Sequence, residues 1–94
     1  MIGEIKKLPI TFRKHGYDYE LVDREEKKAI YVQSYEGRVL AFEIIKITVR
    51  PERYIDLYGK FVGAHEEYPG SESWGTKAWT ICDKEKAMQK YHSL

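Results

Sequence analysis

The sequence predicts an α+β domain, an antiparallel meander of four to five strands with one short C-terminal helix packed on the sheet. Apolar and polar residues alternate through most of the first fifty positions, which is typical of strands. Short turn signals separate these stretches, whereas parallel neighbours would need crossovers of a dozen residues or more. An apolar stripe with helical spacing closes the chain. The 94 residues fit one small domain spanning 1–94.

Four strands are expected before Pro51. The predicted order is a strand over Leu8–Lys14, a turn at Gly16, a strand over Tyr17–Val22, a charged turn over 23–28, a strand over Ala29–Tyr35, a turn at Glu36-Gly37 and a long strand over Arg38–Val49. In the first strand, Ile10 and Phe12 share one face. In the second, Tyr17, Tyr19 and Leu21 do. Each strand therefore offers one apolar face to a core.

The long strand over 38–49 differs because both of its faces are partly apolar. Ile45 and Ile47 fall on one face, and Phe42 and Ile44 on the other. We therefore expect a central strand that is covered on both sides. The helix would cover one side, and either the middle segment or a second copy of the chain would cover the other. Because one short helix covers only one face, a two-fold homodimer is expected.

The segment after Pro51 carries weaker signals. The proline lacks an N–H, so we expect it to end central pairing. Residues 52–75 are predicted to form a short strand or turn and then a long loop, which in so small a domain is often functional. A further strand is expected over Trp74–Cys82. Asp83 is a good N-cap for a helix from Lys84 to about Ser93. Its apolar stripe consists of Ala87, Met88, Tyr91 and Leu94.

The sequence offers no recognisable catalytic or metal-binding set. Cys82 is the only cysteine. We expect it to be a small core residue at a strand end, and not a reactive thiol. His65 precedes two glutamates, but no second histidine lies at ligand spacing. We therefore expect a protein that is not an enzyme and that has no cofactor and no metal.

The composition of the chain disfavours two classes of partner, nucleic acid and membranes. Lys and Arg number 16 against 15 Asp and Glu, a net charge of +1. Because proteins that bind phosphates usually carry a clear basic excess, nucleic acid is disfavoured as a partner. No apolar run approaches the roughly 18 to 20 residues that span a bilayer. The N-terminus lacks the apolar stretch of a signal peptide. We expect a cytoplasmic protein with no membrane partner.

The informative excess is aromatic, because Phe, Trp and Tyr make up 14% of the chain. Such side chains suit interfaces. Several acidic and aromatic residues cluster in the predicted loop. The candidate binding residues are Glu66, Glu67, Tyr68, Glu72 and Trp74. In the alternative interpretation, Tyr68 and Trp74 fold back over the core.

The C-terminal third resembles a known family. The stretches that carry the resemblance are Glu67–Thr80 and Lys84–Tyr91, with Gly16–Val22 and Ala41–Ile44 upstream. They resemble a family of short proteins from phages, prophages and mobile elements of gut-type bacteria. The resemblance covers most of the chain and implies a bacterial host cell as the location. The family has no established activity to carry over.

The sequence therefore favours a non-enzymatic interaction module. We expect an accessory protein of a phage or mobile element that binds and inhibits a host protein, including a defence protein. The alternative is a nucleic-acid or nucleotide-binding module that stacks bases on aromatic side chains. The acidic residues of the predicted loop speak against that alternative, because they would repel phosphates.

Overall fold

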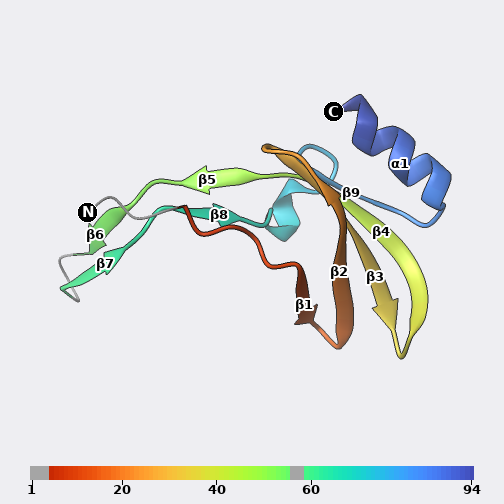
Figure 1. Cartoon of the computed structure of the whole chain (residues 1–94), viewed down its shortest axis with the longest axis horizontal. Helices are drawn as coiled ribbons and strands as arrows, with labels where there is room; N and C mark the ends of the chain where they lie inside the picture. Colours follow the sequence, from red (N-terminus) through yellow and green to blue (C-terminus); the bar gives the residue numbers. More distant parts are fainter. Residues whose placement is uncertain (1–4, 56–58) are drawn as a thin grey trace.

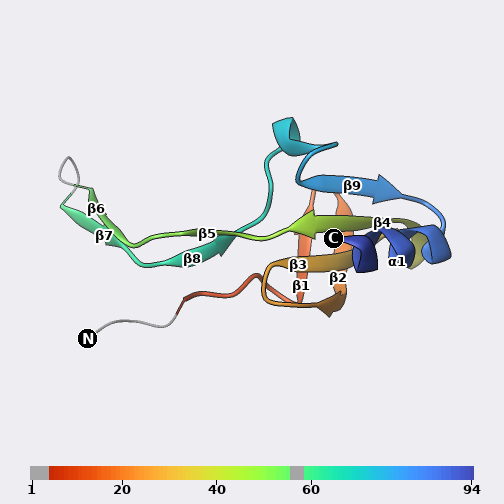
Figure 2. The same ribbon diagram turned by 90° about the horizontal axis from the view of Figure 1, so that it is seen from above.

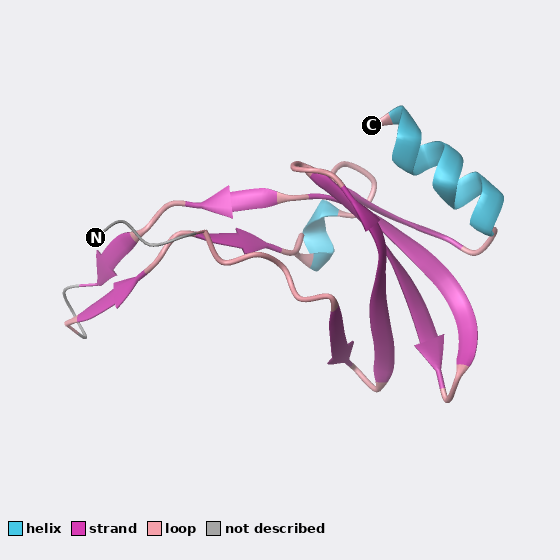
Figure 3. Ribbon diagram, viewed as in Figure 1, coloured by secondary structure: helices cyan, strands magenta, loops and turns pink. Residues whose placement is uncertain are grey.

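A computed structural model describes residues 5–55 and 59–94. The fold is α+β, as predicted: mostly antiparallel strands and one C-terminal helix (Figures 1 and 3). The elements are β1 (Thr11–Lys14), β2 (Tyr17–Arg24), β3 (Lys28–Tyr35), β4 (Arg38–Lys46), β5 (Thr48–Arg50), β6 (Arg53–Ile55), β7 (Lys60–Val62), β8 (His65–Glu67), a 3-10 turn (Ser71–Ser73), β9 (Ala78–Ile81) and α1 (Lys84–Ser93).

The main sheet has five strands in the order β1-β2-β3-β4-β9, and every neighbouring pair is antiparallel. Two tight turns build the meander. His15 and Gly16 have φ of 55° and 84°, and Glu36 and Gly37 have φ of 50° and 78°. Positive φ at both central residues is the geometry that matches the twist of a two-residue hairpin, and glycine adopts it without steric cost. The predicted turn positions are confirmed.

Both faces of β3 and β4 are covered, so β4 is the central strand that the sequence predicts. On one face the buried side chains are Tyr19, Ala29, Tyr31, Ile45, Ile47 and Ala78, with Leu8, Phe12, Tyr68 and Trp74 packed against them. On the other face Ile30, Phe42 and Ile44 pack against Ala87 and Tyr91 of α1. The face of the sheet opposite α1 is therefore covered by residues of the same chain, so a second copy is not needed to cover it.

Helix α1 forms where the sequence predicts it. The Asp83 carboxylate accepts a hydrogen bond from the Lys86 backbone N–H at 2.9 Å, which satisfies a donor that the first turn leaves free. Ala87 and Tyr91 are fully buried against the sheet. At its other end, the Lys28 ammonium donates to the Tyr91 carbonyl at 2.8 Å. Positive charge at a helix C-terminus is stabilising.

The segment after β4 is a long hairpin. The sequence predicts a short strand or turn and then a long loop over 52–75, and the loop is wrong where β7 and β8 lie. β5 pairs with β8 and β6 with β7. The two pairings share one offset, because the three steps from Arg50 to Arg53 match the three steps back from His65 to Val62. The hairpin, residues 48–55 and 59–67, projects from the main sheet as a two-stranded arm (Figures 1 and 2). The molecule measures 45 × 30 × 25 Å.

Pro51 is compatible with this hairpin because of the direction in which its nitrogen points. The Lys6 N–H donates to the Ala64 carbonyl, and the Glu66 N–H donates to the Lys6 carbonyl. The backbone groups of Ala64 and Glu66 thus face the N-terminal segment and not β5. By the shared offset, Pro51 lies opposite Ala64, so its missing N–H would point out of the arm's free edge. Proline is tolerated at such an edge position.

Two side-chain expectations need correction. Ile10 is 68% exposed and lies in the bend before β1, so it does not share a face with Phe12 as the sequence predicts. Leu8 instead packs against the core together with Phe12. Cys82 is exposed and not part of the core, because β9 ends at Ile81 and Cys82 lies in the bend before the helix cap.

Candidate functional site

Glu66, the first of the predicted binding residues, lies inside the molecule and not on an acidic surface. Its residue exposure is 7%. Both carboxylate oxygens accept hydrogen bonds from the Arg24 guanidinium, at 2.7 and 2.8 Å, and one also accepts from the Leu8 N–H at 2.9 Å. The Arg24 guanidinium lowers the pKa of Glu66 to about 2. This clasp joins the root of the arm to β2 and to the N-terminal segment.

Tyr68 follows β8 directly and packs on the core. Its ring centre lies 5.4 Å from that of Phe12 and 5.7 Å from that of Tyr31, both edge-to-face. Its hydroxyl donates a hydrogen bond to the Glu43 carboxylate. Burial, followed by this hydrogen bond, raises the pKa of Tyr68. Of the two arrangements that the sequence left open for Tyr68, its contacts correspond to the one folded back over the core.

Glu43 is a carboxyl group in the middle of the sheet, a position that sequence reasoning did not single out. It lies on β4 opposite Tyr31 of β3 and Thr80 of β9, and it is 8% exposed. Burial raises its pKa, while the Tyr68 hydroxyl and the charge of Lys14 oppose that rise. The sequence signal for this position is a single acidic residue on the apolar face of the strand that also carries Ile45. Glu43 therefore provides a polar contact inside the core, the hydrogen bond with Tyr68.

The other predicted binding residues lie elsewhere on the surface. Glu67 is half-exposed and forms an ion pair with Arg50 at 3.0 Å. Glu72 is exposed in the 3-10 turn. Trp74 is half-buried, and its indole N–H donates to the Thr80 hydroxyl at 2.7 Å. The structure brings Tyr68 and Trp74 within contact, with ring centres 6.5 Å apart, but it does not gather all five residues on one surface.

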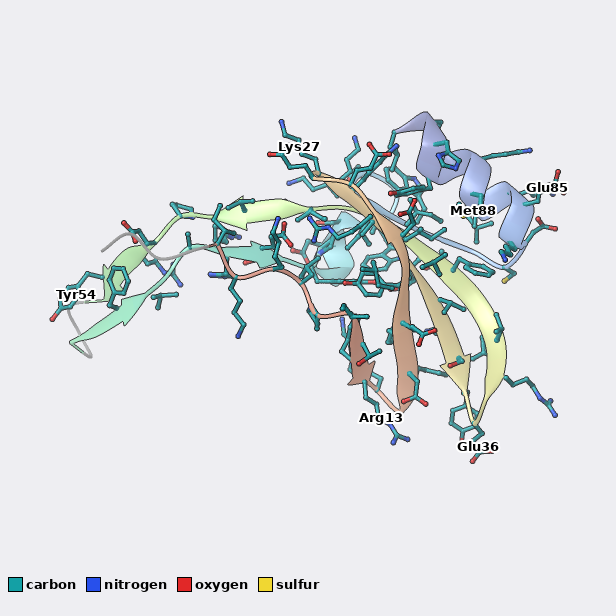
Figure 4. All side chains as sticks on the ribbon, in the orientation of Figure 1. Arg13, Lys27, Glu36, Tyr54, Glu85 and Met88 are labelled. Carbon is teal, nitrogen blue, oxygen red and sulfur yellow. The ribbon has the colours of Figure 1, made fainter. Side chains whose placement is uncertain are left out.

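Among the residues that the structure describes, the most exposed aromatic side chains belong to β6 and β7, near the far end of the arm. Tyr54 of β6 and Phe61 of β7 are directly opposite each other in the register, so they share one face of the ribbon. They are 62% and 59% exposed. Figure 4 shows Tyr54 at the end of the molecule remote from α1. The sequence signal that was missed is Gly59, whose φ of 58° reverses the chain between them.

Exposed charged residues lie near this aromatic pair in the chain and on the neighbouring N-terminal segment. Arg53 and Glu52 are exposed beside Tyr54, and Lys6 and Lys7 are exposed on the N-terminal segment that flanks β8. The arm's other acids, Glu66 and Glu67, are both engaged in ion pairs. The end of the arm is therefore an exposed apolar contact with a charged rim, which is the general anatomy of a protein–protein contact surface.

Residues 5–55 and 59–94 contain no group of three or more His, Cys, Asp or Glu side chains arranged to hold a metal ion. The helix of this part of the chain is too short and too polar to cross a membrane.

In comparisons with protein-family models, curated proteins and solved structures, nothing matches the chain.

Proposed function

We propose that the protein is a non-enzymatic interaction module that contacts a partner protein through the end of its arm. The supporting observation is the exposed cross-strand pair Tyr54 and Phe61 on a ribbon that stands clear of the body. Aromatic anchors dominate the energetics of protein interfaces, and the charges around them mainly set the association rate. Neither ring packs against the core, whereas Tyr68 does.

The resemblance to short proteins of phages and mobile elements supports a bacterial host protein as that partner. In this proposal the module is an accessory protein that blocks a functional surface of a host protein, for example of a protein that serves in host defence. A projecting ribbon suits such a role, because it can enter a recessed site that the flat face of a sheet cannot reach.

The experiment is a pull-down of tagged protein from a bacterial lysate followed by mass spectrometry. The variant Tyr54→Ala/Phe61→Ala should lose a protein that the wild type captures in stoichiometric amount. Tyr35→Ala is the matched control, because Tyr35 is 47% exposed but lies on the body at the end of β3. Equal capture by the wild type and the arm variant would contradict the proposal, as would equal loss in the control.

Substitutions in the predicted loop test the alternative location of the contact. Glu72→Lys changes an exposed residue without touching the core. If it abolishes capture while the arm variant does not, the contact lies around the 3-10 turn, as the sequence predicts.

A nucleic-acid-binding module is the second candidate function. It is supported by a different surface, where the ammonium groups of Lys90 and Lys46 lie 4.2 and 5.9 Å from the ring centre of Trp79.

A further inference from the structure

A row of lysines crosses the end of the main sheet where the arm begins, from β3 and β4 to the residue that precedes β9. Lys28 of β3 lies directly opposite Lys46 of β4. The Lys46 N–H in turn donates to the Lys77 carbonyl at 2.8 Å, which continues the β4–β9 register by one residue. Like charges directly opposite each other destabilise a sheet. Such an unfavourable arrangement of charges is most often found at functional sites.

Lys28 is accounted for by the fold, but the other lysines are not. Its ammonium contacts the carbonyl end of α1 and lies 3.5 Å from a carboxylate oxygen of Glu25. Lys46, Lys77 and Lys90, in contrast, have no acidic group within 4.0 Å in the part of the chain that the structure describes. Their positive charges are therefore available to an anion.

Trp79 lies among these ammonium groups. Its ring centre is 4.2 Å from the Lys90 Nζ and 5.9 Å from the Lys46 Nζ. Trp79 packs against the cluster on the face of the sheet where α1 lies, and Lys77, two residues earlier, is assigned to the same face because its carbonyl extends the pairing with β4 by one residue. The indole is half-buried and therefore presents part of its ring to solvent. Lysines around a partly exposed tryptophan combine phosphate contacts with a stacking surface.

The neighbouring turn adds one more lysine and two acids. Lys27 projects from the β2–β3 turn (Figure 4), and its carbonyl accepts from the Ile47 N–H. Glu25 and Glu26 line a hollow there together with Lys27, Lys28 and Lys46. The acids confine the positive surface on this side, so an anion is expected to lie over Lys46, Lys77 and Lys90. This local excess of charge coexists with a net charge of only +1 for the chain.

We propose that this lysine–tryptophan surface, made of Lys46, Lys77, Trp79 and Lys90, binds single-stranded nucleic acid without sequence preference. The ammonium groups contact successive phosphates, and a base stacks on Trp79 when Lys90 moves from the ring to a phosphate. The tryptophan favours nucleic acid over an acidic peptide, because a carboxylate side chain gains nothing from an aromatic ring face. The surface is separate from the aromatic pair of the arm, so this proposal does not depend on the proposed protein partner.

The test is fluorescence anisotropy with a labelled oligothymidylate of about 16 nucleotides at salt concentrations between about 50 and 200 mM. The triple variant Lys46→Gln/Lys77→Gln/Lys90→Gln should weaken binding at least about tenfold at the lowest salt. It should also reduce the slope of log affinity against log salt by about 2, because each phosphate contact on a single strand contributes about 0.7. The matched control is Lys6→Gln/Lys84→Gln/Lys86→Gln, which removes the same charge from exposed lysines elsewhere.

Tryptophan fluorescence provides a second measurement, which detects stacking of a base on Trp79 and does not respond to phosphate attraction alone. Oligothymidylate should quench Trp79, so quenching should persist in Trp74→Phe and disappear in Trp79→Phe. Equal weakening by the two triple variants would overturn the proposal in favour of diffuse attraction. Absence of binding at about 50 mM salt would overturn it outright. Equal affinity for a polyglutamate peptide would show that the surface recognises acidic protein. The variant Tyr54→Ala/Phe61→Ala should bind the oligonucleotide like the wild type.

Discussion

The body and the arm of this protein use aromatic side chains in opposite ways. In the body, Tyr31 and Tyr91 are almost completely enclosed, and they fill the two faces of the sheet. In the arm, Tyr54 and Phe61 are mostly exposed on a ribbon that is a single layer thick. The first pair holds the fold together, whereas the second contributes little to it. Residues that stability does not require are the ones available for binding.

Two buried carboxylates, Glu66 at the root of the arm and Glu43 in the middle of the main sheet, have pKa values shifted in opposite directions. Glu66 meets a guanidinium and a backbone N–H, so ionisation is favoured and its pKa falls to about 2. Glu43 accepts a hydrogen bond from the Tyr68 hydroxyl, but burial outweighs this contact and the charge of Lys14, so its pKa rises. The joint of the arm is therefore stabilised by a charge, while the body tolerates one at a cost.

The largest expected effect is in the body. Tyr91→Ala should lower the free energy of unfolding by about 3 kcal/mol or more, because it removes a fully buried ring from the contact between α1 and the sheet. Tyr91→Phe should change little, since the hydroxyl makes no hydrogen bond within the described ranges. Urea denaturation followed by circular dichroism measures both. Equal losses from Tyr91→Ala and the exposed control Lys86→Ala would show that the helix does not hold the body together.

The joint comes next. Glu66→Gln should cost about 2 kcal/mol, because it replaces a charge-assisted pair with Arg24 by neutral hydrogen bonds. The pKa of Glu66 is lowered from 4.5, so its stabilising contribution is present above about 4.5 and is lost as the pH falls towards 2. Thermal melts across this acid range should converge for wild type and variant. Glu67→Gln, in the exposed pair with Arg50, is the control and should change stability much less.

A stabilising change is expected at Glu43. Its raised pKa means that protonated Glu43 favours the folded state, and that this contribution is lost as the pH rises through the raised value. Glu43→Gln keeps an acceptor for the Tyr68 hydroxyl and should therefore gain about 1 kcal/mol at neutral pH. At about pH 4 the two proteins should be nearly equal. Urea midpoints at both pH values measure this, and a loss at neutral pH would mean that the carboxylate charge itself supports the core.

The smallest effect on stability is expected at the arm's end. Tyr54→Ala/Phe61→Ala should shift the free energy of unfolding by no more than about 0.5 kcal/mol, because both rings are mostly exposed. Differential scanning calorimetry measures the shift. A loss of several degrees would remove the contrast between body and arm, because the aromatic pair would then be a structural element of the ribbon.

Local signals were enough to predict the meander. The paired positive-φ turns at Gly16 and Gly37, the alternation along β2 and β4, and the Asp83 cap each depend on residues adjacent in sequence. The fold class and the helix follow from these signals alone. They also place a central strand correctly, because apolar residues on both faces of one strand require two covering layers.

The arm and the true environments of the candidate residues depend on distant partners. Pro51 ends a central strand but is tolerated at an edge, and only the contact between Lys6 and Ala64 decides which applies. Glu66 looks like a surface acid until Arg24, 42 residues away, is placed beside it. The exposure of Tyr68 likewise depends on Phe12 and Tyr31, which no neighbouring residue reveals.

The unbroken register of the arm makes its reach adjustable. Because Arg50 pairs with His65 and Arg53 with Val62 at one offset, a residue can be deleted from each strand without shifting any other pair. Deleting one residue from each strand would turn the Tyr54–Phe61 pair to the opposite side of the ribbon. Deleting two from each would restore its side and draw it inward by about 7 Å. Deleting residues two at a time from each strand thus shortens the arm without changing the side that the aromatic pair faces, and the loss of capture with each step would report how deep the proposed partner's binding site is.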